Sequence, residues 1–94
     1  MSNKDYVLSI FKKWHDKELS DSELINELNQ FNSNFDDSDI WFRFFKHDTL
    51  ATTINDIEKD LADNNRDYII EQIETALENP EDFQLNYDYY EQLW

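Results

Sequence analysis

The sequence predicts an all-α fold: a single-domain bundle of four to five helices around an aromatic central helix, with a C-terminal tail docked against it. Three observations predict this fold class. Apolar residues recur at helical spacing in four segments of the chain. A fifth segment is apolar nearly all round, as expected of a helix inside a protein. Seven Phe, five Tyr and three Trp can fill the core of a 94-residue chain, which is the length of one domain.

The first helix is predicted over residues 4–17. Ser2 or Asn3 can cap it, and Asp5 lies in the first turn, where a carboxylate meets the positive end of the helix dipole. Its apolar stripe is formed by Val7, Ile10, Phe11 and Trp14.

The second helix, over residues 21–32, has the sharpest start signal in the chain. Ser20 and Glu23 match the S-x-x-E capping box, and Leu19 and Leu24 are placed as a hydrophobic staple.

The oxygen-rich segment 32–37 invites comparison with a calcium loop. Asp37 stands where the EF-hand needs Gly, and Arg43 stands where it needs a bidentate Glu. The comparison therefore fails, and helix capping by Asp37 or Ser38 is the preferred interpretation.

The central helix is predicted over residues 38–46. Five of the six residues from Ile40 to Phe45 are large and apolar, and Arg43 alone interrupts them. The rest of the chain is polar and the net charge is −14, so we expect this block to supply much of the core.

Two further helices are predicted over residues 49–63 and 66–78. Asp48 or Thr49 can cap the former, whose apolar repeat is Leu50, Ile54, Ile57 and Leu61. The latter ends before Pro80, because the residue before a proline avoids helical geometry. Its buried residues are predicted to be Ile69, Ile70, Ile73, Ala76 and Leu77.

The tail, residues 80–94, has an ambiguous pattern. Apolar and polar residues alternate from Phe83 to Tyr89 with the period of a strand, but the sequence offers no second strand for pairing. We therefore expect an extended segment docked across the bundle or a short last helix from Asp88. No repeat, linker or second domain is evident, so residues 1–94 are predicted to form one domain.

Composition excludes several classes of protein. The chain has no Cys, which excludes a disulfide framework and suits a reducing cytosol. No apolar run approaches the roughly 18 residues of a membrane span, and the N-terminal residues lack a signal-peptide pattern. We expect a cytoplasmic protein of a bacterial or phage-infected cell.

Catalysis is not expected. Gly is absent, although phosphate-binding loops and nucleophile elbows need it. His15 and His47 each neighbour an acid, but neither belongs to a spaced ligand pattern such as H-E-x-x-H. No catalytic residue, metal or cofactor is therefore predicted. A hydrolase that uses acids with His47 remains a third hypothesis.

Carboxylates gather on one face of each of two predicted helices. On the helix over 66–78 they are Asp67, Glu71, Glu74 and Glu78. On the helix before it they are Asp56, Asp60 and Asp63. Like charges at these spacings cost a helix about 0.2 to 0.5 kcal/mol each, so the three pairs on 66–78 oppose that helix by roughly 1 kcal/mol. Solvation alone can explain one such stripe, but two stripes favour a function.

The C-terminal third of the chain carries no Lys or Arg. Residues 67–94 hold eight acids and no base, giving −8, whereas residues 1–66 hold fourteen acids and eight bases, giving −6. Charges within a Debye length of about 10 Å act together, so this region should steer toward a basic surface. In the tail, tyrosines and a tryptophan among acids are typical of interface anchors, although Leu93 and Trp94 could equally serve only to seal the end of the bundle. The tail residues predicted to bind a partner are Glu81, Asp82, Asp88, Tyr89, Tyr90 and Glu91.

In charge, size and helicity the chain resembles small acidic helical inhibitors that occupy the nucleic-acid site of another protein. One group is the bacterial immunity proteins that neutralise nuclease toxins, some with a Tyr pair among acids, as Tyr89-Tyr90 stands here. The other is the phage DNA mimics with anti-restriction or anti-CRISPR activity, whose carboxylates replace phosphates. The resemblance implies a non-catalytic inhibitor whose partner is a basic protein, a nuclease or another nucleic-acid-binding protein, with no direct nucleic acid or membrane contact. The alternative is a helical adaptor or assembly subunit whose acidity serves solubility.

Overall fold

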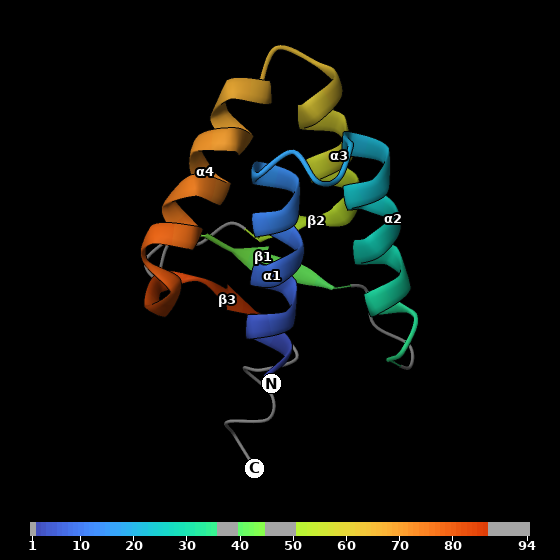
Figure 1. Ribbon diagram of the computed structural model, residues 1–94, viewed down its shortest axis with the longest axis vertical. Coiled ribbons are helices and arrows are strands. Elements are labelled where there is room, and N and C mark those ends of the chain that lie inside the picture. Colours follow the sequence, from blue (N-terminus) through green and yellow to red (C-terminus); the bar gives the residue numbers. More distant parts are fainter. Residues whose placement is uncertain (1, 36–39, 45–50, 87–94) are drawn as a thin grey trace.

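Four helices and a small three-stranded antiparallel sheet make up the described part of the computed structural model, residues 2–35, 40–44 and 51–86 (Figure 1). The helices are α1 (Asn3–His15), α2 (Asp21–Asn32), α3 (Ile54–Ala62) and α4 (Arg66–Glu78). The strands are β1 (Trp41–Arg43), β2 (Thr52–Thr53) and β3 (Gln84–Leu85), and a single 3-10 turn is η1 (Pro80–Asp82). The protein is therefore mostly helical, and the prediction of a purely α fold does not hold for the described residues.

Local capping signals explain where the helices begin. The Ser2 hydroxyl accepts the N–H of Asp5 at the start of α1, as predicted. At α2 the reciprocal capping box of Ser20 and Glu23 is present, and the Ser20 N–H holds the pKa of the Glu23 carboxyl below its usual range. The predicted bounds of α2 and α4 are confirmed, whereas α1 ends at His15, two residues earlier than predicted.

The central helix predicted over 38–46 is wrong in its described part, because Trp41–Arg43 form β1. Ile40, Phe42 and Phe44 are buried with the period of a strand. Trp41 and Arg43 between them are only half-buried, and the Arg43 guanidinium carbon lies 5.2 Å from the Trp41 ring centroid. Residues 36–39 and 45–50 lie outside the described ranges, and with them the proposed caps Asp37 and Ser38.

The strands that pair with β1 come from opposite directions along the chain. Phe42 stands opposite Thr52 of β2 and opposite Leu85 of β3, so β1 is the middle strand. The expectation that the tail had no strand to pair with is therefore wrong. Its strand period was real, since Phe83 and Leu85 are buried and Gln84 between them is only half-buried.

Helix α3 begins later than the predicted residue 49. Thr52 and Thr53 belong to β2, and Thr53 then caps α3 through a second capping box, in which its hydroxyl accepts the N–H of Asp56 (3.2 Å). Thr52 and Thr53 pair with β1. They therefore do not form the first turn of the helix that the apolar repeat had predicted from residue 49.

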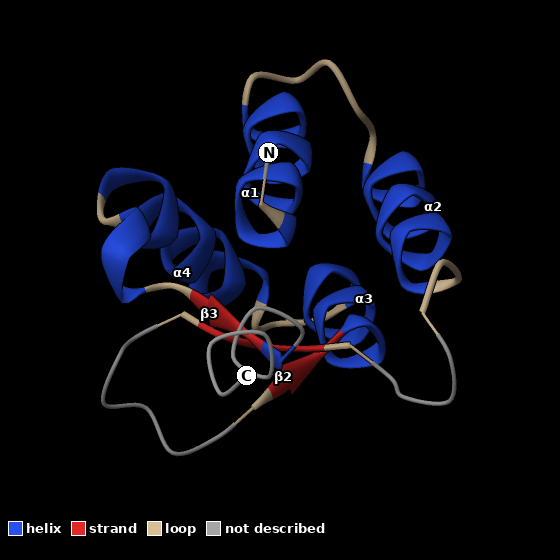
Figure 2. Cartoon of the chain, turned by 90° about the horizontal axis from the view of Figure 1, so that it is seen from below, coloured by secondary structure: helices blue, strands red, loops and turns tan. Residues whose placement is uncertain are grey.

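The centre of the core is a cluster of four phenylalanines: Phe11, Phe42, Phe44 and Phe83. Their ring centroids lie 5.6 to 6.2 Å apart in the six pairs, and each side chain is at most 2% exposed. Phe11 belongs to α1 and the other three to β1 and its neighbourhood in the sheet. Figure 2 shows the sheet below α1, on the side of the molecule between α3 and α4. The cluster therefore joins α1 to the sheet.

The end of α1 is closed by a lysine in the left-handed conformation. Lys17 has φ 65°, the only positive φ in the described ranges of a chain without Gly. The N–H of Glu18 donates to the carbonyl of Lys13 (2.8 Å), and the N–H of Lys17 donates to that of Trp14 (3.0 Å). This is a Schellman motif, in which Gly is the usual residue at the position of Lys17 because a Cβ is unfavourable there.

We expect Lys17→Gly to raise the free energy of unfolding by about 1 kcal/mol, because it removes the Cβ from a left-handed position. Urea unfolding followed by circular dichroism measures this change. Lys17→Ala is the matched control, since it removes the same charge but keeps the Cβ. An equal gain for both variants would mean that charge, not backbone conformation, limits stability at this position.

We expect Phe42→Ala to lower the free energy of unfolding by about 3 to 5 kcal/mol, because it leaves a cavity in the phenylalanine cluster. The change in urea midpoint at unchanged slope measures the loss. Tyr68→Ala, which truncates a side chain that is 56% exposed, should stay within about 0.5 kcal/mol of the parent. Similar losses for the two variants would contradict the placement of Phe42.

Candidate partner-binding surface

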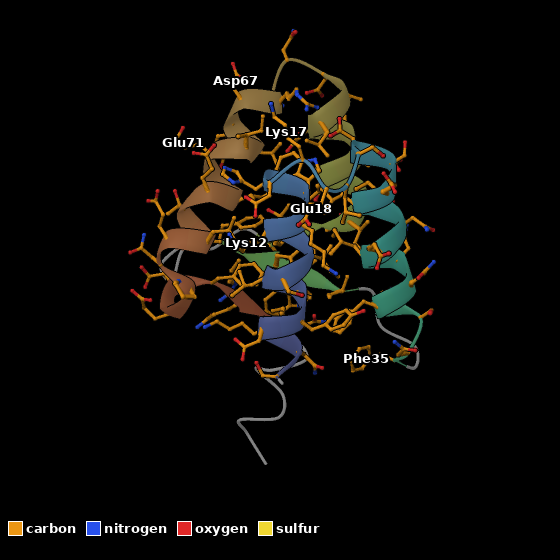
Figure 3. The ribbon with its side chains drawn as sticks, viewed as in Figure 1. Lys12, Lys17, Glu18, Phe35, Asp67 and Glu71 are labelled. Atoms are coloured by element: carbon orange, nitrogen blue, oxygen red, sulfur yellow. The ribbon has the colours of Figure 1, made fainter. Side chains whose placement is uncertain are left out.

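The acidic stripe predicted on residues 66–78 lies along the outer face of α4. Its four exposed carboxylates are those of Asp67, Glu71, Glu74 and Glu78. The opposite face is buried through Ile69, Ile73 and Ala76. Asp67 and Glu71 extend from α4 away from the other helices (Figure 3). The helical period thus separates the charged face from the core face as the sequence predicted.

The stripe continues from α4 into η1, where Glu81 is exposed and Asp82 is half-buried. Of these six carboxylates, Glu74 alone lies within 4 Å of a basic side chain in the described structure, that of His15, which is charged only when it is protonated. No lysine or arginine of the described ranges pairs with any of the six. Within the described residues their charge is therefore left mainly to solvent and not to paired lysines or arginines.

The second predicted stripe, on α3, is largely occupied by local structure. The Asp56 carboxylate accepts the N–H of Thr53 (3.1 Å) in the capping box of α3. The Asp63 carboxylate accepts the N–H of Asn65 (2.8 Å) in the turn that leads into α4. Asp60 is half-buried. A helix cap at Asp56 and a turn at Asp63 thus account for two of these three acids, and α4 with η1 holds the more available set.

The predicted tail residues Asp88, Tyr89, Tyr90 and Glu91 lie outside the described residues. Their position relative to the acidic stripe is therefore not described. The question of whether the tail ends in a helix falls in the same segment.

Helix α1 runs beside the acidic face of α4 and brings cations to its edge. His15 Nε2 lies 3.6 Å from a carboxylate oxygen of Glu74, and His15 Nδ1 lies 3.8 Å from one of Asp16. Lys12 pairs with the same Asp16 at 3.2 Å, within α1. Between the two helices lies a hollow of about 390 Å³, whose walls include Lys12, His15, Glu74 and Glu78.

A polar junction joins all four helices at the start of α4. The Arg66 guanidinium bonds to the two carboxylate oxygens of Asp21 (2.6 and 3.5 Å) and to the carbonyl of Leu61 (3.1 Å). The indole N–H of Trp14 donates to the same carboxylate (2.9 Å). The hydrogen bond from Arg66 lowers the pKa of Asp21, and the bond from Trp14 acts in the same direction. This junction holds the N-terminal end of the acidic helix in place.

Two residues of α4 were not singled out by the sequence. Tyr68 is 56% exposed beside the acidic stripe, and nothing in its spacing distinguished it from a core aromatic. Gln72 is buried on the core face, and its Oε1 has no hydrogen-bond partner. Its position three residues after Ile69 does indicate burial, since residues i and i+3 share a helix face.

Within the described ranges, no group of three His, Asp or Glu side chains is arranged to hold a metal ion. None of the helices there combines the length and apolarity needed to cross a bilayer. His47, the residue of the hydrolase hypothesis, lies outside the described residues.

Comparisons with known proteins give no relative: no family model, no curated protein and no solved structure matches this chain.

We expect Asp21→Asn to lower the free energy of unfolding by about 1 kcal/mol at neutral pH. The variant keeps the side chain's shape but loses the charge-assisted bonds, whose strength is reduced by partial exposure to solvent. Because the folded-state pKa of Asp21 is depressed, its contribution is complete above the ordinary aspartate pKa of about 3.9 and is lost as the pH falls through the folded value.

Urea unfolding of parent and variant at neutral pH and at successively lower pH measures this difference. It should shrink toward zero in acid. Glu58→Gln, which removes an exposed carboxylate from α3, is the control and should show no comparable difference at neutral pH. A gap between parent and Asp21→Asn that persists at the lowest pH would exclude the ion pair as its cause.

Proposed function

We propose that this protein is a non-catalytic acidic inhibitor that acts inside a bacterial or phage-infected cell. Its acidic face binds the basic surface with which a nuclease or another nucleic-acid-binding protein grips its substrate, in the manner of DNA mimics and nuclease immunity proteins. The main binding residues are the six acids of α4 and η1. The tail residues Asp88, Tyr89, Tyr90 and Glu91 support them, as do Asp56 and Asp60 of α3 and Asp63 directly after it.

The observation that carries this proposal is the unbalanced acidic face of α4. Its carboxylates repel one another along the helix, and no lysine or arginine of the described residues forms an ion pair with them. A helix selected only for stability gains from Lys placed four residues from Glu. The chain instead has no cation at all after Arg66. A basic partner would supply the missing counter-charges.

Competition explains how such a face would inhibit. Residues at i, i+3 and i+4 on a helix have Cβ atoms about 5 to 6 Å apart, so successive carboxylates can each engage a separate Lys or Arg. Those are the side chains that contact phosphate oxygens in nucleic-acid complexes. The net charge of −14 would also accelerate the encounter with a basic surface, most strongly at low salt.

The rigidity of α4 favours this use. Ile69, Ile73 and Ala76 are at most 1% exposed and fix the helix against the core. Arg66, the first residue of α4, is hydrogen-bonded to Asp21 of α2. The carboxylates are thus presented on a backbone that need not be ordered on binding, which reduces the entropic cost of association.

A second candidate is an adaptor that binds through aromatic contacts. The exposed rings of Tyr68 on α4 and Tyr6 on α1 favour it, since exposed Tyr is common at protein interfaces. An adaptor of this kind would keep its affinity in high salt, whereas an inhibitor that binds through carboxylates would lose it.

We expect a variant with Glu71→Gln, Glu74→Gln and Glu78→Gln to lose its partner. If each interfacial ion pair contributes roughly 1 kcal/mol, affinity should fall on the order of a hundredfold. The test is capture from bacterial cytosol by the immobilised full chain, with elution by a salt gradient and identification of the captured protein. A gel-shift assay then measures whether the parent chain displaces nucleic acid from that protein and the variant does not.

The matched control carries Asp5→Asn, Glu27→Gln and Glu58→Gln, which remove three carboxylates from α1, α2 and α3. It has the same net charge as the α4 variant, so it separates the specific face from the overall field. Capture that survives both variants and high salt would reject the inhibitor and favour the adaptor.

A further inference from the structure

The seam between α1 and α4 is hollowed along its length. A hollow of about 600 Å³ lies beside the turn after α1, and the hollow of about 390 Å³ lies farther along the seam. Both are lined by His15 and Glu74, so the two hollows adjoin at this pair of side chains. Together they are here called the α1–α4 groove. Figure 3 shows Lys12 and Lys17 on the α1 side of this seam.

The floor of the α1–α4 groove is apolar. Ile70 lines the larger hollow and Leu77 the smaller, and both side chains are half-buried against the core. Leu19 adds a further half-buried side chain at the larger hollow. Apolar surface left open in this way is stabilised when another apolar side chain covers it.

The rim of the α1–α4 groove is negative. Six carboxylates and three Lys or Arg side chains line the two hollows, which leaves a charge of −3 with His15 neutral. Asp21 is paired with Arg66, and Asp16 is paired with Lys12. Among the described residues, no lysine or arginine pairs with the other four acids, Glu18, Glu23, Glu74 and Glu78.

We propose that the α1–α4 groove receives a short segment of the basic partner in which one arginine stands between two apolar residues. This inference rests on the proposed function and adds to it a specific subsite. The apolar residues lie on Ile70 and Leu77, and the guanidinium lies between the carboxylates of Glu74 and Glu78.

The dimensions fit such a segment. Ile70 and Leu77 are seven residues apart on α4, which is about 10 Å along the helix axis. The first and third residues of a three-residue extended segment are two steps apart, about 7 Å. Side chains of leucine size that lean outward along the groove cover the remaining distance of about 3 Å. Successive side chains of an extended segment point to opposite sides, so the outer two can face the floor while the middle one reaches the rim.

Arginine suits the rim better than lysine does. Glu74 and Glu78 are four residues apart and lie on the same face of α4. A planar guanidinium has five donors and can bond to two carboxylates at once, and it loses less hydration than an ammonium does. An anionic ligand is disfavoured, because the groove is net negative and the Arg66 guanidinium is already bonded to Asp21.

The test uses the full chain labelled with ¹⁵N and the peptide acetyl-Leu-Arg-Leu-amide as probe. We expect saturable amide shifts centred on Ile70, Glu74 and Leu77. Acetyl-Leu-Glu-Leu-amide should give none, and acetyl-Ser-Arg-Ser-amide should bind at least tenfold more weakly. Shifts that centre on Asp67 and Glu71 instead, or that never saturate, would overturn the subsite.

Leu77→Arg fills the smaller hollow with a charged side chain of the protein itself. It should therefore weaken binding of the Leu-Arg-Leu peptide at least tenfold. Tyr68→Arg adds the same charge to α4 outside the residues that line the groove, and it should change binding less than threefold. Ile70→Arg blocks the other end of the groove and serves if Leu77→Arg alters the helical circular dichroism. Equal effects of the groove variants and Tyr68→Arg would overturn the subsite.

These results are separable from the proposed function. If the partner is still captured by the parent, lost with the α4 glutamine variant and retained by Leu77→Arg, the acidic face binds but the groove does not. If the peptide binds the groove and no nucleic-acid-binding protein is captured, the subsite stands and the proposed inhibitor fails.

Discussion

Packing of Phe11 against Phe42, Phe44 and Phe83 is the interaction on which the rest of the structure depends. The four rings come from α1, from β1 and the residue after it, and from the residue before β3. The sheet has strands of only two or three residues, too short to persist in water without a packed face. The phenylalanine cluster supplies that face, since an aromatic side chain buries about 150 to 250 Å².

The position of α4 follows from the core and from the junction at Arg66 together. Ile69 and Ile73 orient the helix by burial, and Arg66 connects its start to α2 and to the end of α3. Since the same Asp21 also accepts the Trp14 indole, α1 is set relative to α4 by the junction as well. The α1–α4 groove is the space that this arrangement leaves, and the junction residues Trp14, Asp21 and Arg66 line its larger hollow.

What could be predicted from the sequence was local, and what could not was nonlocal. The capping box of Ser20 and Glu23 and the stop at Pro80 act within a few residues, and the bounds of α2 and α4 were right. Phe42 was placed in a helix because its partners, Thr52 and Leu85, are 10 and 43 residues away and belong to strands too short to recognise. The alternation of Ile40, Phe42 and Phe44 with Trp41 and Arg43 was the available signal. The α4 stripe was predictable from period alone, whereas the groove required the packing of two helices.

The residues that stabilise α4 and the acids proposed to bind a partner lie on opposite faces of the helix. The free energies of burial and of charge repulsion explain why both faces can coexist. The like-charge pairs of the stripe oppose the helix by roughly 1 kcal/mol in total. Full burial of a single Ile contributes about 1.5 to 3 kcal/mol, and α4 buries Ile69 and Ile73. The core face therefore offsets the charged face with a margin. It follows that acids on the outer face can change in number and position to suit a partner while the fold stays as it is, since none of Asp67, Glu71 and Glu78 forms an ion pair within the described structure.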